Sequence, residues 1–137
     1  MANDELHNGP GMIYGIGTDI VEVARIEDSL SRFGDAFAQR ILNELEWQDY
    51  AASRVKARFL AKRFAAKEAF AKALGTGIRG AASFDNIGIG HDALGKPEFQ
   101  LAPALQALLQ QKGIGSLHLS ISDEKALAAA FVVLEKA

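Results

Sequence analysis

Positive charge is concentrated in residues 54–79, around a single carboxylate. Eight of the 15 lysine and arginine residues lie in this segment, and Glu68 is its one acidic residue. The eight are Arg54, Lys56, Arg58, Lys62, Arg63, Lys67, Lys72 and Arg79. Basic side chains bind phosphate oxygens, and a carboxylate among them is a ligand for a divalent cation. The segment therefore predicts a site for a polyphosphate and a metal ion.

Asp19, at the end of the first apolar segment, is the candidate for a second metal ligand. Taken alone, Asp19 fits a helix N-cap better, and Glu68 fits an exposed ion pair with Lys72 worth about 0.2–0.5 kcal/mol. Taken together, the two carboxylates suit Mg²⁺, which takes its remaining ligands from water and substrate phosphate. Arg63, Lys67 and Lys72 would then neutralise the phosphate oxygens that the metal does not reach.

The remaining motifs that could bind a ligand or take part in catalysis are weak signals. Gly75 and Gly77 could offer backbone N–H groups to a phosphate, but a helix C-cap explains Gly75 equally well. His118 is expected to be an ordinary half-exposed strand residue, and Asp123 a turn residue or a neighbour of the phosphate site. The chain has no phosphate-binding loop, dinucleotide fingerprint or nucleophile elbow, which argues against the enzyme classes that carry them.

The composition limits the classes of protein to consider. The chain has 137 residues, 49% of them hydrophobic, which is enough for one domain with a buried core. Its net charge of −2 argues against a protein that coats nucleic acid. The lack of cysteine excludes disulfides and is typical of a cytoplasmic protein. No apolar run approaches the roughly 20 residues that span a bilayer. Residues 1–11 are expected to form a flexible extension, and residues 12–137 a single domain.

The apolar periodicity predicts an α+β domain, in which an antiparallel or mixed sheet packs around one long helix. Helices are predicted at 23–33, 35–42, 44–52, 55–74 and 103–112, with Asp35 as an N-cap. Strands are predicted at 12–21, 84–90, 97–101 and 117–122. Residues 126–134 combine helix-favouring alanines with the strand-like run Phe131-Val132-Val133-Leu134. A strand is preferred there, because residues 122–125 can turn the chain back against the preceding strand.

Several blocks together resemble holo-acyl-carrier-protein synthases, the short bacterial class of 4′-phosphopantetheinyl transferases. The blocks are residues 16–22, 25–27, 63–73 and 75–78, in that order, and the likeness extends over about residues 12–135. Gly95-Lys96-Pro97 and the terminal strand pair also match the family. The blocks carry Asp19, Glu68 and Lys72, the residues already selected for their chemistry.

The resemblance implies a Mg²⁺-dependent transfer of the 4′-phosphopantetheine arm of coenzyme A to a serine of apo-acyl carrier protein. Adenosine 3′,5′-bisphosphate leaves, and the product supports fatty acid biosynthesis. Asp19 and Glu68 match the metal ligands, and Lys72 matches a lysine that stabilises or protonates the departing phosphate. The coenzyme A-contacting positions correspond to Arg63, Lys67, Gly77, Gly95, Lys96 and Pro97.

The resemblance also implies partners. Short members of the family form homotrimers whose active sites lie at subunit boundaries. Residues 25–40 match the region that docks the acidic carrier, with Arg25 and Arg40 for its carboxylates and Phe37 for an apolar contact; a solvated helix face is the alternative for both arginines. Many members have a histidine where this chain has Asp123, to which no catalytic role is assigned.

Two other functions are compatible with the residues. One is a non-catalytic module that binds coenzyme A or a nucleotide, although carboxylates beside an anion would then serve no purpose. The other is a structural oligomer whose basic helix binds an acidic protein. Dependence on Mg²⁺ or coenzyme A would separate the transferase from the structural oligomer.

Overall fold

Two antiparallel sheets and one long helix organise the chain in this computed structural model, which describes residues 9–137. Residues 1–8, most of the predicted extension, lie outside the described residues. The helices are α2 (Val23–Phe33), α3 (Asp35–Ile41), α4 (Glu44–Ala52), α5 (Lys56–Leu74) and α6 (Pro103–Gln111). The strands are β1 (Ile13–Glu22), β2 (Ile87–His91), β3 (Pro97–Leu101), β4 (Ile114–Asp123) and β5 (Leu127–Lys136).

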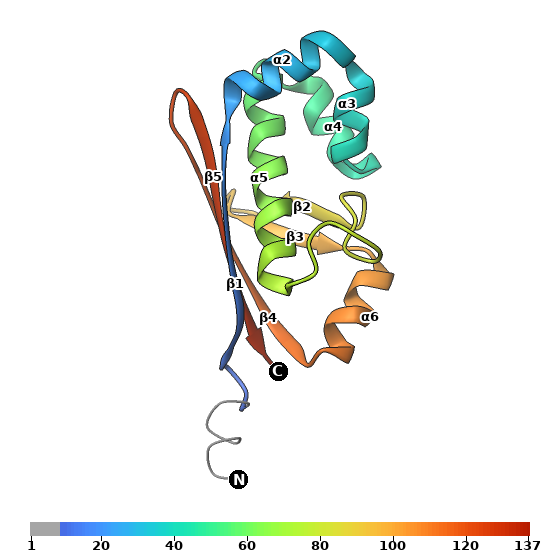
Figure 1. Cartoon of the computed structure of the whole chain (residues 1–137), viewed down its shortest axis with the longest axis vertical. Helices are drawn as coiled ribbons and strands as arrows, with labels where there is room; N and C mark the ends of the chain where they lie inside the picture. The colour runs from blue at the N-terminus through green and yellow to red at the C-terminus, as the bar shows by residue number, and fades with distance from the viewer. Residues whose placement is uncertain (1–8) are drawn as a thin grey trace.

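The larger sheet has the strand order β1-β5-β4, and β2 and β3 form a separate hairpin. Helix α5 runs along one face of the larger sheet, α2, α3 and α4 gather at one end, and α6 lies toward the other (Figure 1). The predicted α+β architecture around one long helix is confirmed, and so is the strand at the C-terminal segment. Among the described residues, no helix combines the length and apolar character needed to cross a membrane.

The contact between β1 and α5 is unusually close because β1 turns glycines toward the helix. A Cβ atom added to Gly17 would lie 1.8 Å from the carbonyl oxygen of Ala69, and one added to Gly15 would lie 1.9 Å from that of Ala73. No larger residue fits either position without moving the strand. The next inward-facing residue on β1 is Asp19, which is therefore held close to the same helix.

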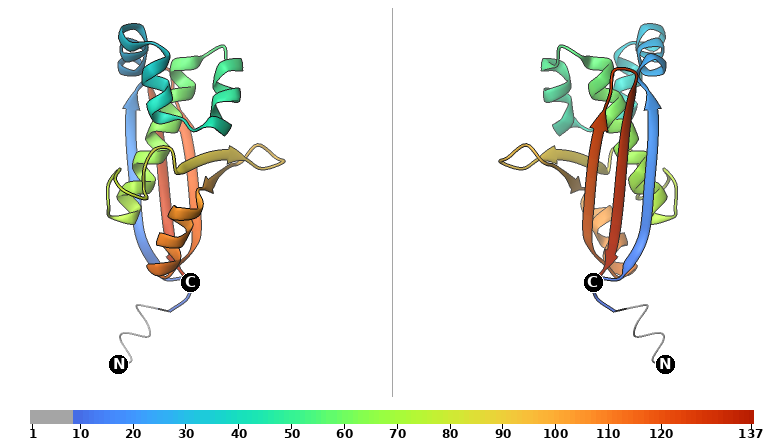
Figure 2. Two further views of the ribbon diagram at one scale, coloured as in Figure 1. Left: turned by 90° about the vertical axis from the view of Figure 1, so that its right-hand side faces the viewer. Right: turned by 90° about the vertical axis from the view of Figure 1, so that its left-hand side faces the viewer.

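The two faces of the larger sheet differ in cover. Alternate residues of β5, from Ala128 to Leu134, are buried against α5 and form part of the core. The opposite face carries Ile16, Ile20 and Phe131, which are 53%, 65% and 49% exposed. No described element covers this outer face (Figure 2). The molecule thus presents an uncovered apolar sheet surface.

One alternative and one local expectation for acidic residues are wrong. Asp19 is not a helix N-cap, because it lies within β1 opposite Ala130, and the residue preceding α2 is Glu22. Asp35 lies in the first turn of α3, while Gly34 takes the N-cap position with φ of 62°. An acidic residue in the first turn still interacts favourably with the helix dipole.

Candidate active site

Asp19 and Lys72 form the best-defined part of the candidate site. Lys72 Nζ lies 2.8 Å from Asp19 Oδ1 and 3.0 Å from the carbonyl oxygen of Thr18. The Asp19 side chain is 17% exposed, whereas that of Lys72 is 52% exposed. The close contact of β1 with α5 therefore joins a sheltered carboxylate to a lysine that reaches solvent.

Glu68 lies one helical turn before Lys72 on α5 and is half-buried. Burial raises the pKa of Glu68 above its usual value, the charge of Asp19 raises it further, and Lys72 opposes the shift. The three side chains thus share one electrostatic environment. The structure brings together Asp19, Glu68 and Lys72, which the sequence selected from segments about 50 residues apart.

These residues fit a hard divalent cation. Their carboxylate oxygens are the donors that Mg²⁺ prefers, and a cation would relieve the repulsion between Asp19 and Glu68, which Lys72 only partly offsets. Within residues 9–137 no group of three or more His, Cys, Asp or Glu side chains could hold a metal ion. A two-carboxylate site therefore needs oxygen ligands from water or a phosphorylated substrate.

A hollow of about 410 Å³ opens beside Asp19, between β1, α2 and α5. Arg25 and Phe37, two of the three predicted docking residues, line this hollow together with Asp19 and Phe64. Arg25 is exposed and its Nε lies 3.7 Å from Glu22 Oε1, whereas Phe37 is half-buried. Arg40 is exposed on α3 and is not among the residues that line the hollow.

Arg63 and Lys67 lie in a buried ion cluster rather than at the surface. Both bind the carboxylate of Glu46 on α4, with N–O distances of 3.1 Å and 2.6 Å. Arg63 is 4% exposed, Lys67 0% and Glu46 2%. The structure therefore argues against direct contacts of Arg63 and Lys67 with coenzyme A, because both side chains are buried, and the Lys67 ammonium and the Arg63 Nη1 already donate to Glu46 and to backbone carbonyls.

The buried ammonium group of Lys67 donates three hydrogen bonds. Its Nζ donates to Glu46 Oε1, to the carbonyl of Ile41 at 2.6 Å and to that of Phe84 at 2.8 Å. Burial lowers the pKa of Lys67, and Glu46 opposes that shift. Three acceptors around one nitrogen require three donors, which only the ammonium form supplies. Lys67 is therefore a charged residue inside the fold.

The other predicted coenzyme A contacts are dispersed. Lys96 and Pro97 line a hollow of about 380 Å³ between the β2–β3 hairpin and β4. Gly95, with φ of 86°, forms the hairpin turn, which Asp92 organises through its side chain. The N–H of Gly77 donates to the carbonyl of Ala71 as part of the helix end, so that donor is not directed at a ligand. Within one chain, the hollow lined by Lys96 and Pro97 is separate from the one beside Asp19.

Asp123 has a clear structural role. Its Oδ2 accepts from Arg58 at 3.0 Å, and its Oδ1 lies 3.8 Å from Lys62 Nζ. Arg58 also donates to the carbonyls of Glu124 and Lys125, at 2.5 Å and 2.7 Å. The β4–β5 turn is thus fastened to α5, and the charge of Asp123 is neutralised by basic residues of the segment 54–79.

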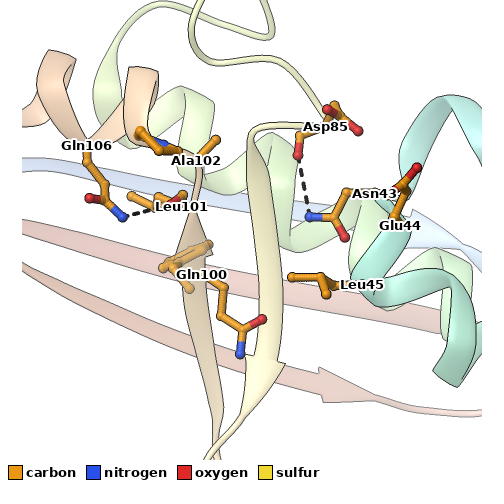
Figure 3. Close-up of a pocket in the computed structure, with 10 residues that line it drawn as sticks. Asn43, Glu44, Leu45, Asp85, Gln100, Leu101, Ala102 and Gln106 are labelled. Carbon is orange, nitrogen blue, oxygen red and sulfur yellow. Dashed lines mark hydrogen bonds between the residues drawn. The ribbon is translucent and has the colours of Figure 1, made fainter.

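A larger hollow, about 660 Å³, lies between α4, α6 and the hairpin (Figure 3). Its polar side chains include Asn43, whose Nδ2 donates to the carbonyl of Asp85, and Gln106, which donates to that of Leu101. No basic side chain is among the described residues that line it. Because Glu44 and Asp85 make it acidic, this hollow does not suit a polyphosphate.

The comparisons with known proteins identify the family of the chain. The profile of the 4′-phosphopantetheinyl transferase superfamily matches residues 15–132. A holo-[acyl-carrier-protein] synthase of Nitrosospira multiformis is 59% identical over 125 residues, which cover 91% of this chain and 100% of the relative. The crystal structure of the holo-[acyl-carrier-protein] synthase from Neisseria meningitidis is 60% identical, with a TM-score of 0.89 over 91% of this chain and 100% of that one.

A Bacillus anthracis holo-(acyl-carrier-protein) synthase in complex with CoA (3′,5′-ADP) is 42% identical, with a TM-score of 0.75 over 91% of this chain and 98% of that one. The present chain belongs to the 4′-phosphopantetheinyl transferase superfamily. The predicted family and fold class are confirmed.

Sequence reasoning missed Glu46, the acceptor shared by Arg63 and Lys67. One signal was available, because Asn43 and Glu46 have the spacing of a capping box and form one at the start of α4. That signal predicts a helix start but says nothing of the cations, which lie 17 and 21 residues away in the chain.

Proposed function

We propose that this protein transfers the 4′-phosphopantetheine arm of coenzyme A to a serine hydroxyl of an apo-acyl carrier protein, using Mg²⁺ held by Asp19 and Glu68. The observation that carries the proposal is the convergence of two carboxylates and Lys72 within a chain of this family. A module that only binds coenzyme A would gain nothing from two carboxylates beside a diphosphate.

The residues present fit a phosphoryl transfer. The serine oxygen forms a new bond to phosphorus while the bond to the leaving adenosine 3′,5′-bisphosphate breaks. The serine proton passes to Asp19 or Glu68, directly or through water. Lys72, which reaches solvent beside Asp19, stabilises the charge on the departing phosphate. A bound Mg²⁺ would supply neutralisation of the phosphate oxygens.

The carrier would approach through the hollow beside Asp19. Arg25 at its edge offers a positive charge to an acidic partner, and Phe37 offers an apolar contact. A docking surface there would lie next to the proposed metal site, as transfer to a bound carrier requires. Arg40 lies outside the hollow and belongs at most to the rim of that surface. We place the reaction in the cytoplasm, in support of fatty acid biosynthesis.

A homotrimer would complete the site. The exposed Ile16, Ile20 and Phe131 form an apolar sheet face that a second copy of the chain can cover. Lys96 and Pro97 lie at a different hollow from Asp19 in the same chain, so a neighbouring subunit is the natural source of the hairpin contacts. Light scattering should give three times the mass of the chain; a monomer with full activity would contradict a shared site.

The decisive experiment is a transfer assay by intact-protein mass spectrometry. Apo-acyl carrier protein is incubated with coenzyme A and this protein, with Mg²⁺ or with excess chelator. The carrier should gain the mass of one phosphopantetheine group only with Mg²⁺, and restoring Mg²⁺ should restore the gain. Binding of coenzyme A without any gain in carrier mass would favour the non-catalytic module.

A further inference from the structure

Glu46 anchors a buried cluster that none of the proposed chemical steps uses. Its Oε2 accepts from Arg63 at 3.1 Å and its Oε1 accepts from Lys67 at 2.6 Å, while Oε1 also accepts the backbone N–H of Asn43 at 3.0 Å. The Arg63 guanidinium also lies 4.6 Å from the centroid of the Phe59 ring. Among the described residues, no buried side-chain nitrogen or oxygen lacks a hydrogen-bond partner. Each fully buried polar side-chain atom of the cluster thus has at least one hydrogen-bond partner.

The hydrogen bonds of this cluster join segments that are distant in the chain. Lys67 extends from α5 to the carbonyl of Ile41, at the end of α3, and to that of Phe84, just before β2. Arg63 extends from α5 to the carbonyl of Ile89, within β2. Glu46 adds α4 to the same network. The network as a whole therefore ties α5 to α3, α4 and β2, and Glu46 is the acceptor that its two cations share.

Both ends of the network lead to predicted site residues. Lys67 immediately precedes Glu68, so its three hydrogen bonds restrict the turn of α5 that presents the proposed metal ligand. Ile89, bound by Arg63, lies in the hairpin whose turn carries Lys96 and Pro97. Within one subunit, the cluster thus contacts both the turn that presents the proposed metal carboxylate and the hairpin, which in the proposed trimer would serve the site of a neighbouring subunit.

We propose that Glu46 is a positioning residue for the transfer, which acts through Lys67 on Glu68 and through Arg63 on the β2–β3 hairpin. This inference rests on the proposed function. A role in stability alone is the competing explanation. Buried ion clusters are weak stabilisers, since apolar residues of similar volume often replace them without loss. Directed hydrogen bonds, in contrast, hold a ligand carboxylate in one orientation, as the outer partners of metal ligands do.

The test compares two variants that distinguish a positioning role of Glu46 from a role in the stability of the fold. Glu46→Gln keeps the shape of the side chain but removes the charge shared by two cations. The triple variant Glu46→Leu/Arg63→Met/Lys67→Met replaces the whole cluster with apolar groups and leaves no buried charge unpaired. Thermal unfolding reports stability, calorimetry reports Mg²⁺ affinity in the presence of coenzyme A, and the carrier assay reports kcat and KM.

We expect the triple variant to fold and to retain at least a weak transfer, with Mg²⁺ affinity lowered by about 10- to 100-fold and KM for coenzyme A raised in parallel. Glu46→Gln should show the same changes together with a lower midpoint of unfolding. Glu44→Gln, an exposed carboxylate on the same helix, is the matched control and should leave all the constants unchanged.

Unchanged Mg²⁺ affinity and unchanged KM in the folded triple variant would overturn the inference, because the cluster would then be needed for folding only. That result is distinct from failure of the proposed function. In the latter case the unmodified protein itself would fail to transfer the phosphopantetheine arm, whatever the residue at position 46.

Discussion

Helix α5 carries two charged clusters that are built from similar residues and have opposite surroundings. Lys72 meets Asp19 with half of its side chain in solvent, whereas Lys67, five residues earlier, meets Glu46 with none of its side chain exposed. The open cluster has two carboxylates to one cation, and the closed cluster has one carboxylate to two cations. Only the open cluster has acceptor capacity left for a metal and access for a substrate.

The difference shows why the number of basic residues in a segment says little about ligand binding. Five of the eight basic residues in 54–79 bind carboxylates of the chain itself, namely Arg58, Lys62, Arg63, Lys67 and Lys72. These five residues pair with three separate carboxylates, those of Asp123, Glu46 and Asp19. The apparent phosphate site in the sequence is therefore a set of internal ion pairs, of which one pair reaches the candidate active site.

The sharpest test of the difference between the open and the closed cluster replaces Lys72 or Lys67 with methionine. Lys67→Met removes three hydrogen bonds and breaks the buried ion pair with Glu46, so the free energy of unfolding should fall by about 3–5 kcal/mol. Lys72→Met should change it by less than about 1 kcal/mol, because the Lys72 side chain is 52% exposed and its charge is screened by solvent. Denaturant titration measures both. Equal losses would show that the two clusters do not differ as burial indicates.

Substitutions in the open cluster should instead lower transfer and leave stability nearly unchanged. We expect Asp19→Ala or Glu68→Ala to lower transfer by about 10²- to 10³-fold, as loss of one preorganised electrostatic group does, with the fold retained. Circular dichroism and mass spectrometry of the carrier report the fold and the transfer. Asp49→Asn, an exposed carboxylate on α4, is the control for loss of a carboxylate. Transfer at the unmodified rate in either alanine variant would show that the metal assignment is wrong.

Much of this arrangement could be predicted from the sequence, and the main exception depends on packing between segments that are distant in the chain. The length of α5, its end at Gly75 and the terminal strand follow from local patterns of apolar residues and glycine. The meeting of Asp19 with Glu68 was inferred from residue types and from the family likeness. The partner of Lys67 was not, because it depends on how α4 packs over α5, which no local pattern encodes.

The spacing between β1 and α5 offers a further test of the open cluster. Gly17→Ala places a methyl group 1.8 Å from the Ala69 carbonyl oxygen, so strand and helix must separate, at about 1–3 kcal/mol of stability. Transfer should fall as well, because Asp19 moves with the strand. Gly75→Ala, with open space but φ of 89°, should cost about 1–2 kcal/mol and leave transfer largely intact. If Gly17→Ala transferred normally, this spacing would not control the site.

The smallest expected effect concerns the docking surface at the edge of the open cluster. Arg25→Glu reverses an exposed charge, and an exposed ion pair is worth about 0.2–1 kcal/mol, so carrier affinity should fall by about two- to fivefold. Affinity for coenzyme A should not change. Arg25 lines the hollow on the α2 side of Asp19, and its one ion pair within the described residues is with Glu22. Surface plasmon resonance with immobilised carrier, paired with calorimetry of coenzyme A, separates the two affinities. Equal losses for both ligands would mean that the carrier and coenzyme A occupy one surface, and that the hollow beside Asp19 is not a docking site of its own.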